Sequence, residues 1–224
     1  MTARFAQVGL PFEFVESIAH DDPLIAVDPE IQEVARAMGR WSEMAWSCIH
    51  GHLKIIERFL ASDCELAVIC EDDVMLSQSL AQDLPQAVRA FQGLDLDVML
   101  LGYLTPDQLD QVTSDTILQT DEFIYHGYEF NVYGTQMYLI SREYAEFVHR
   151  TYGIASGFGR RTLVEPGLLS FNADWIITKN GRRARVYPLL AIEERGGGKG
   201  YNDPFQEYWH DHCHDGQVGR RPYF

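Results

Sequence analysis

The chain has 224 residues, and 18 lysines and arginines against 33 aspartates and glutamates give a formal net charge of −15 at pH 7. Such an acidic chain lacks the basic footprint of a nucleic-acid-binding protein, and it is not suited to electrostatic docking on anionic lipid. Hydrophobic residues make up 46% of the sequence, which is enough for one large core and excludes a disordered chain. The negative charge does not exclude binding of a small anionic ligand, because a metal ion and local donors can hold a nucleotide.

The first 60 residues contain patterns typical of helices and of one short strand. Residues 2–8 resemble the end of a helix that a Gly-Leu-Pro sequence closes. Residues 12–16 alternate apolar and acidic side chains, which favours a short strand. Residues 21–40 begin as an acidic loop and continue as a helix. Residues 41–60 place apolar side chains at helical spacing and predict a long amphipathic helix.

Two continuous apolar runs predict buried strands in the middle of the chain. They cover 66–70 and 98–102, and such runs are typical of strands in a mainly parallel sheet. Residues 78–92 between them favour a helix, with Pro85 at a possible kink. Residues 105–121 are polar and predict an excursion over the surface.

The alternation of strands and helices continues to residue 187. A strand over 135–140 leads into a helix over 141–152 with Ser141 as its N-cap. A short helix over 172–180 and a strand over 184–187 follow. This order predicts an α/β fold with a mainly parallel central sheet.

The organisation of the chain favours one domain in a reducing compartment. We expect a single domain over residues 1–195 and an irregular C-terminal tail over 196–224 that packs on the site or closes over it. The four cysteines are far apart without C-x-x-C spacing, which indicates a reduced, cytoplasmic protein. No stretch is long and apolar enough to predict a transmembrane segment, although peripheral association with a membrane-bound complex stays open.

Glu71, Asp72 and Asp73 directly follow the first predicted buried strand and are the most informative residues. Three adjacent carboxylates repel one another, and the repulsion grows as they leave water. Ligands of α/β proteins bind at the C-terminal ends of strands, where Mg²⁺ or Mn²⁺ would relieve this repulsion. If the strand continues, alternation places Glu71 and Asp73 on one side and Asp72 on the other, so that one side could hold a metal while the other meets a sugar hydroxyl. The alternative is a solvated acidic turn.

The acidic triplet lies in a segment, residues 67–76, that resembles the "LEDDV" core of glycosyltransferase family 25. That family includes lipooligosaccharide and collagen galactosyltransferases. Other segments resemble family motifs in the same order along the chain, and these are residues 11–15, 48–53, 97–102, 134–141, 173–175 and 186–188. The resemblance therefore spans about residues 10–195.

The resemblance implies a GT-A-like, Rossmann-type fold, a divalent cation (Mn²⁺ or Mg²⁺) and a nucleotide-sugar donor, most commonly UDP-galactose. It implies an inverting transfer to a hydroxyl of a glycan or lipooligosaccharide acceptor. By this analogy Glu71 and Asp72 bind the donor, and Asp73 with Glu71 holds the metal, which stabilises the charge on the departing UDP. Asp174 matches a family acid and is the expected general base. Its alternative role is a carboxylate that stabilises a helix N-terminus.

The sequence departs from the family pattern in two places. The family's opening strand and arginine-rich turn are not seen, so the chain either begins inside the domain or lacks part of the donor site. His52 matches the family's Ser-His pair and is expected to assist donor binding, with Gly51 where serine is usual and His50 as the alternative match. Because His50 and His52 are two residues apart on a helix, we expect one to pack near the acidic strand and the other to face outwards.

The C-terminal part contributes three further candidates. Lys199, in the glycine-rich segment 193–200, could neutralise phosphate as a loop closes over the donor. His210 and His212 belong to a run dense in ligand types and could complete a metal site, although their spacing matches no structural zinc pattern.

Three functions remain in competition. The first is a metal-dependent glycosyltransferase that moves a hexose, most simply galactose. The second is a catalytically impaired GT-A-like domain that binds a glycan or a protein partner. The third is a metal-dependent phosphohydrolase or nucleotidyltransferase built on the acidic triplet.

Overall fold

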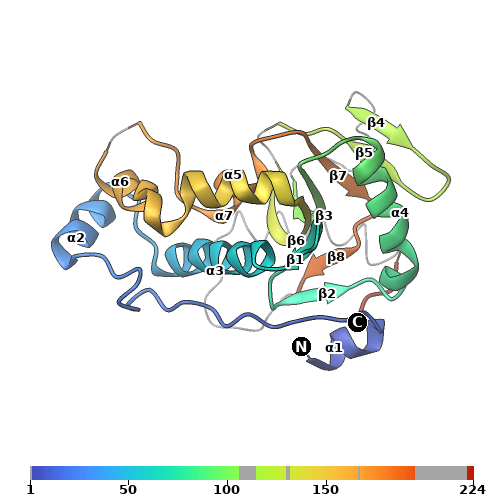
Figure 1. Cartoon of the computed structure of the whole chain (residues 1–224), viewed down its shortest axis with the longest axis horizontal. Helices are drawn as coiled ribbons and strands as arrows, with labels where there is room; N and C mark the ends of the chain where they lie inside the picture. The colour runs from blue at the N-terminus through green and yellow to red at the C-terminus, as the bar shows by residue number, and fades with distance from the viewer. Residues whose placement is uncertain (1, 106–114, 130–131, 166, 195–220) are drawn as a thin grey trace. The chain divides into compact units, whose positions relative to one another are not determined.

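A computed structural model describes residues 2–105, 115–129, 132–165, 167–194 and 221–224 (Figure 1). The chain divides into two compact units, each assembled from segments far apart in sequence. The sheet unit comprises Met1–Phe12, Val68–Ile140 and Gly181–Phe224. The helical unit comprises Glu13–Ala67 and Ser141–Asn180.

A six-stranded sheet with the strand order β1-β6-β3-β7-β5-β4 forms the centre of the sheet unit. The strands are β1 (Leu66–Cys70), β3 (Val98–Leu104), β4 (Thr116–Gln119), β5 (Ile124–His126), β6 (Tyr133–Ser141) and β7 (Arg183–Tyr187). Strand β3 pairs in parallel with β7 and antiparallel with β6, and β5 pairs antiparallel with both β4 and β7. The described pairings are mostly antiparallel, so the prediction of a mainly parallel sheet is wrong.

The reason for this error lies in β3 and β6. All seven residues of β3 are buried, and so are the seven inner residues of β6. A strand covered on both faces is apolar throughout, whichever direction its neighbours run. The apolar run therefore reports burial and not strand direction.

A small two-stranded sheet pairs β2 (Val74–Leu76) with β8 (Ala191–Glu193) in antiparallel register. It approaches β3 closely, because the Leu190 amide donates to the Leu101 carbonyl at 2.8 Å. A Cβ on Gly102 would lie 2.8 Å from the Ala191 carbonyl oxygen, so only glycine permits this approach. Helices α1 (Thr2–Val8) and α4 (Leu80–Gly93) complete the described elements of the sheet unit.

The helical unit is built around α3 (Glu43–Leu60) and α5 (Arg142–Tyr152), which run side by side in Figure 1. The other described helices of this unit are α2 (Pro29–Ala37), the 3-10 turn Ile154–Ser156, α6 (Phe158–Val164) and α7 (Ala173–Thr178). Ser141 caps α5 by accepting from the Tyr144 amide, as predicted. The Arg142 side chain donates to the carbonyls of Leu60 and Cys64, at the C-terminal end of α3, where a cation is favourable.

The predicted helices over 2–8, 41–60, 78–92 and 141–152 are confirmed as α1, α3, α4 and α5. The predicted strand over 12–16 is wrong, because these residues form no strand. Within the helical unit, the Glu13 carboxylate instead accepts from Arg58 of α3 at 2.9 Å. The expected full burial of β1 is also wrong: Ile69 alone is buried and Val68 is 38% exposed, because β1 is an edge strand.

Candidate functional site

The acidic triplet lies on a turn that leads from β1 into β2. Asp72 is exposed, whereas Glu71 and Asp73 are half-buried. Alternation along a strand predicted this division, but here the chain turns at Asp72 and Asp73. The triplet is therefore not simply a solvated acidic turn, because two of its three carboxylates are partly removed from water.

Asp73 has a carboxylate oxygen for which the described residues supply no partner. Its Oδ1 is buried and accepts no hydrogen bond from the described part of the chain. Burial raises the pKa of Asp73 to about 7, and the negative charges of Glu71, Glu193 and Asp72 add to the effect. A carboxylate in this position is stabilised by a proton or by a cation.

Strand β6 supplies two polar side chains beside the triplet. The Thr135 hydroxyl donates to Glu71 Oε1 at 2.6 Å, and the Glu71 amide donates to the Gln136 carbonyl at 3.0 Å. Gln136 is 5% exposed, and its side-chain Oε1 also has no hydrogen-bond partner among the described residues. Preceding them, Gly134 has φ +146°, and a Cβ there would lie 1.9 Å from Gln136 Oε1. Glycine at 134 thus makes room for the amide oxygen.

Glu193 at the end of β8 brings a third buried or half-buried carboxylate to this cluster. It is 6% exposed and lies opposite Val74 in the β2–β8 register. Its Oε2 accepts from Gln136 Nε2 at 3.4 Å, and the next amide, that of Glu194, donates to the Asp73 carbonyl at 2.7 Å. We call Glu71, Asp73, Gln136 and Glu193 the acid cluster.

The acid cluster fits a divalent cation on the chemistry of its donors. Carboxylate and amide oxygens are the ligands that Mg²⁺ and Mn²⁺ prefer. A cation would satisfy the oxygens of Asp73 and Gln136 that lack partners, and it would offset the mutual repulsion of the carboxylates. Glu71, oriented by the Thr135 hydroxyl, has the kind of second interaction that commonly positions a metal ligand.

His52 and Asp174, the other predicted site residues within the described chain, belong to the helical unit. His50 and His52 are 4% and 3% exposed, so the prediction that one of them faces outwards is wrong. Helix α3 packs against both α5 and α7, so more than one of its faces is covered. Asp174 is half-buried in the first turn of α7, whose N-cap is Asn172, in agreement with the structural role considered for it.

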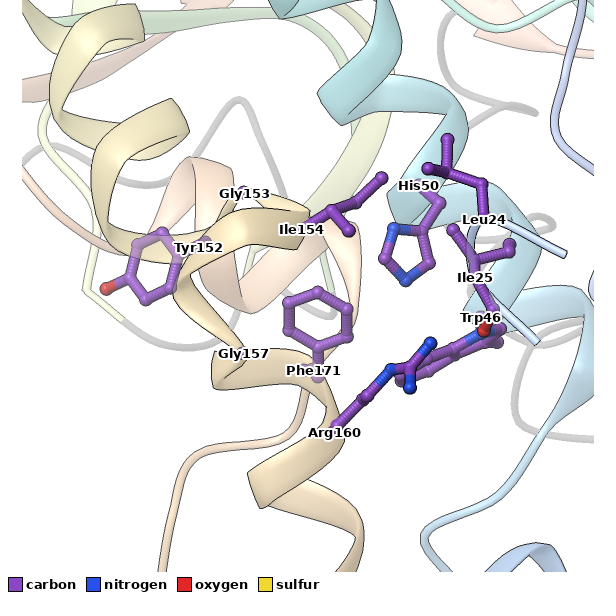
Figure 2. A pocket seen from close by; sticks show the side chains of 11 residues that line it. Leu24, Ile25, Trp46, His50, Tyr152, Gly153, Ile154, Gly157, Arg160 and Phe171 are labelled. Carbon is purple, nitrogen blue, oxygen red and sulfur yellow. The ribbon is translucent and has the colours of Figure 1, made fainter. Parts of the chain in front are cut away.

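A second candidate place is a recess of the helical unit around His50 (Figure 2). The imidazole lies against the rings of Trp46 and Phe171, at centroid distances of 4.8 and 5.4 Å. Neither ring nitrogen of His50 has a hydrogen-bond partner among the described residues. Burial, with the nearby Arg160 charge, lowers the pKa of His50 to about 4, so the ring is neutral at pH 7.

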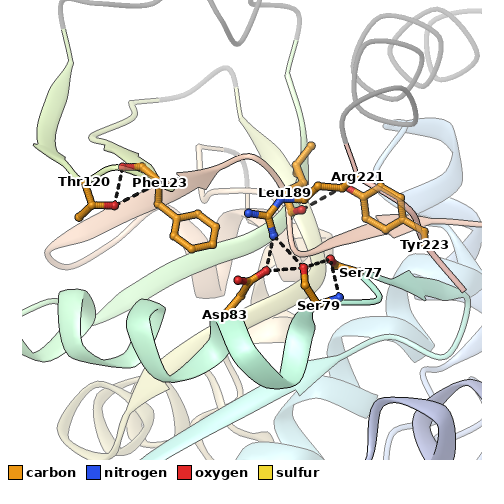
Figure 3. A network of polar contacts seen from close by, with 8 residues as sticks. All are labelled: Ser77, Ser79, Asp83, Thr120, Phe123, Leu189, Arg221 and Tyr223. Atoms are coloured by element: carbon orange, nitrogen blue, oxygen red, sulfur yellow. Dashed lines mark hydrogen bonds and ion pairs between the residues drawn. The ribbon is translucent and has the colours of Figure 1, made fainter.

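Lys199, His210 and His212 lie outside the described residues. The chain on either side of that segment is held on the sheet unit. Before the segment, the Glu194 amide donates to the Asp73 carbonyl. After it, the Arg221 guanidinium forms an ion pair with Asp83 of α4 and donates to Ser79 Oγ (Figure 3). The Gln78 amide also donates to the Pro222 carbonyl at 3.0 Å.

The sequence matches the model of one protein family, described as glycosyltransferase family 25 (LPS biosynthesis protein), over residues 1–153. The chain belongs to glycosyltransferase family 25. It is therefore a glycosyltransferase, which uses a nucleotide-sugar donor and a glycan acceptor. No curated protein matches the sequence. Among the described residues, no helix is long and apolar enough to cross a membrane.

The match to family 25 contains the triplet, His50, His52, Thr135 and Gln136, whereas Asp174 and Glu193 follow it. Gln136 and Glu193 were not among the predicted site residues. For Glu193 a signal was present, because it directly follows the apolar run 189–192, as Glu71 follows 66–70. Gln136 stands in a buried strand, and a polar residue there needs a partner or a ligand.

Proposed function

We propose that this family 25 glycosyltransferase depends on a divalent cation, Mn²⁺ or Mg²⁺, held by Asp73 and Glu71 of the acid cluster. The single observation that carries the proposal is the buried Asp73 Oδ1, which lacks a partner among the described residues and is surrounded by further acids. Glu193 and Gln136 would contribute the remaining protein oxygens. A bound cation supplies neutralisation of the donor's diphosphate as the sugar departs.

The donor in this proposal is a UDP-hexose, with UDP-galactose first, and the sugar is transferred with inversion. Asp72 lies beside the proposed cation ligands and is exposed, so its carboxylate would be open to a hydroxyl of the donor sugar. Asp174 would accept the proton of the acceptor hydroxyl, which an in-line transfer requires. His52 would support donor binding by positioning its surroundings, since it is buried and not open to solvent.

The acceptor in this proposal is a glycan of lipopolysaccharide type, as the description of the family indicates. We propose residues 1–195 as the catalytic domain of GT-A type and 196–224 as a tail, from which Lys199, His210 and His212 would act on the donor and the metal. The location in the cytoplasm and association with a membrane-bound complex stay predictions.

Binding of Mn²⁺ to the full chain tests the proposal, measured by calorimetry with and without UDP. Asp73→Asn is expected to weaken Mn²⁺ binding at least tenfold, because it removes a charged ligand. The matched control is Asp121→Asn, an exposed residue at the β4–β5 turn, which should bind Mn²⁺ as the wild type does. Because the pKa of Asp73 is raised to about 7, Mn²⁺ binding should also weaken below pH 7 as protons compete.

A donor screen decides between the competing functions. The chain is incubated with UDP-galactose, UDP-glucose and UDP-N-acetylglucosamine, with Mn²⁺ or with EDTA, and release of UDP is measured. Release that requires Mn²⁺ supports the proposal. Equal release in EDTA contradicts the metal role. Phosphate release without sugar transfer would favour the phosphohydrolase, and glycan binding with neither Mn²⁺ nor UDP binding would favour the impaired binding domain.

A further inference from the structure

The recess around His50 contains a buried group that the proposed chemistry does not use. His50 is 4% exposed, and both of its ring nitrogens are buried without a hydrogen-bond partner among the described residues. An imidazole in this state leaves a donor and an acceptor unsatisfied, which costs free energy comparable to that of lost hydrogen bonds. Such a group in a cavity indicates a ligand or an ordered water.

The position of the imidazole is set by its neighbours. Trp46 is fixed by its Nε1, which donates to the Ile25 carbonyl at 3.2 Å, and its ring meets His50 edge to face. Phe171 packs against both rings. A Cβ on Gly159 would lie 2.6 Å from Phe171 Cε1, so the glycine admits the phenyl ring to this place. The recess is thus built by contacts and is not a gap in packing.

The size of the cavity restricts what reaches His50. Its volume is about 20 Å³, which is room for one water-sized group. A hydroxyl has this size, and it both donates and accepts, as the neutral imidazole does. A planar nucleobase is too large to enter as a whole.

The rim of the recess is apolar on one side and cationic on the other. Leu24 and Ile154 line the recess and are 57% and 39% exposed, so they offer apolar surface at its rim. Arg160, which also lines it, is exposed, and its Nη2 donates to the Ala26 carbonyl at 3.1 Å. Figure 2 shows the imidazole, the Phe171 ring and the Arg160 side chain around the same space.

We propose that this recess binds a pyranose that carries an acidic substituent, a carboxylate or a phosphate. One ring hydroxyl enters the cavity and bonds to His50, the C–H face of the sugar covers Leu24 and Ile154, and the acidic group meets Arg160. That this sugar belongs to the acceptor glycan rests on the proposed function; the binding itself does not.

Saturation-transfer NMR on the full chain, without metal or nucleotide, tests the inference. The probes are methyl β-D-glucuronide, glucose 6-phosphate and the neutral methyl β-D-glucoside. The two acidic probes distinguish a carboxylate from a phosphate, and at least one of them is expected to bind about threefold more tightly than the glucoside, as an exposed charge pair allows. Equal affinity for all three, or no transfer to any, overturns the proposal, as would a crystal structure with only a water on His50.

Variants then locate the binding. His50→Phe should weaken binding of the preferred probe about tenfold, because the hydroxyl loses its partner. His50→Gln retains a donor and an acceptor and should keep part of the affinity that His50→Phe loses. Arg160→Gln should abolish the preference for the acidic sugar. His149→Gln on the exposed face of α5 is the control and should leave binding unchanged.

The result stays decisive if His50→Phe fails to fold, since His50→Gln and Arg160→Gln report on the same site. Binding unaffected by any of these variants overturns the inference. Its failure is separable from that of the proposed function: Asp73→Asn should lose Mn²⁺ and keep sugar binding, and His50→Gln should keep Mn²⁺ binding.

Discussion

The hydroxyl of Thr135 donates to the Glu71 carboxylate at 2.6 Å, joining strand β6, the neighbour of the edge strand β1, to the first acid of the triplet. Thr135 is 4% exposed, so its side chain is fixed by the sheet. Glu71 is thereby oriented by a residue 64 positions away in sequence. The acid cluster is held by the sheet and not only by its own turn.

Thr135→Val is expected to weaken Mn²⁺ binding about tenfold while the fold is retained. Valine has nearly the same shape but lacks the hydroxyl, so Glu71 loses the interaction that orients it. Calorimetry of the folded variant measures the effect. The control is Thr120→Val at the opposite edge of the sheet, where the hydroxyl donates to the Phe123 carbonyl at 3.2 Å. Unchanged affinity in Thr135→Val would show that Glu71 does not act on the cation.

Gly134→Ala is expected to lower the free energy of unfolding by about 1–3 kcal/mol, because φ +146° is strained for any L residue with a Cβ. The added methyl would also displace the Gln136 amide. Gly51→Ala is the matched contrast: Gly51 lies within α3 with no atom within 4 Å of its Cβ position, so alanine should stabilise by about 0.5–1 kcal/mol. Urea unfolding of both variants checks the opposite signs.

His50 is expected to titrate near pH 4 in the folded protein, which NMR of the imidazole nitrogens would measure. Its pKa is lowered from 6.5 mainly by burial, so the folded state binds this proton less readily than the unfolded state does. The free energy of unfolding therefore has its full value above pH 6.5 as far as His50 is concerned, and it falls as the pH falls towards 4. This loss of stability amounts to about 3 kcal/mol, and His50→Gln should remove this part of the acid sensitivity. A midpoint near 6.5 in the wild type would contradict burial of the ring.

Arg221→Met should lower the free energy of unfolding by about 1–3 kcal/mol, because Asp83 and Ser79 lose a charged partner in a largely buried place. Both side chains of the Arg221–Asp83 pair are about 15% exposed. Arg182→Met is the comparison. Arg182 is itself 53% exposed and pairs with exposed Asp95 and with Asp97, which is 17% exposed. Its removal should cost less stability than that of Arg221, because Asp97 still accepts from the backbone amide of residue 182. A double-mutant cycle with Asp83→Asn isolates the Arg221 pair.

Much of the fold could be predicted because its signals are local. The amphipathic spacing over 41–60 and the N-cap at Ser141 each depend on a few neighbouring residues, and both are confirmed as α3 and α5. Strand direction depends on which distant strand lies alongside. Neither β3 nor β6 carries a local mark of it, so the mainly parallel sheet was predicted wrongly.

The candidate site divides in the same way. The triplet could be found because three acids directly follow an apolar run. Gln136 and Glu193 reach the triplet only through the pairing of β1 with β6 and of β2 with β8. These pairings join distant segments, so no local sequence pattern predicts them. The burial of both His50 and His52 was likewise not predictable from α3 alone, because it depends on the elements that cover the helix.

The antiparallel register of β2 and β8, with Val74 opposite Glu193, has a consequence for how this family member can diverge. Successive strand residues face opposite ways, so a slip of a single residue would exchange Glu193 for Ile192 on the inner face. Residues 188–190, which join β7 to β8, can therefore vary in identity more easily than in number. Insertions and deletions in that connection are expected to be selected against more strongly than substitutions.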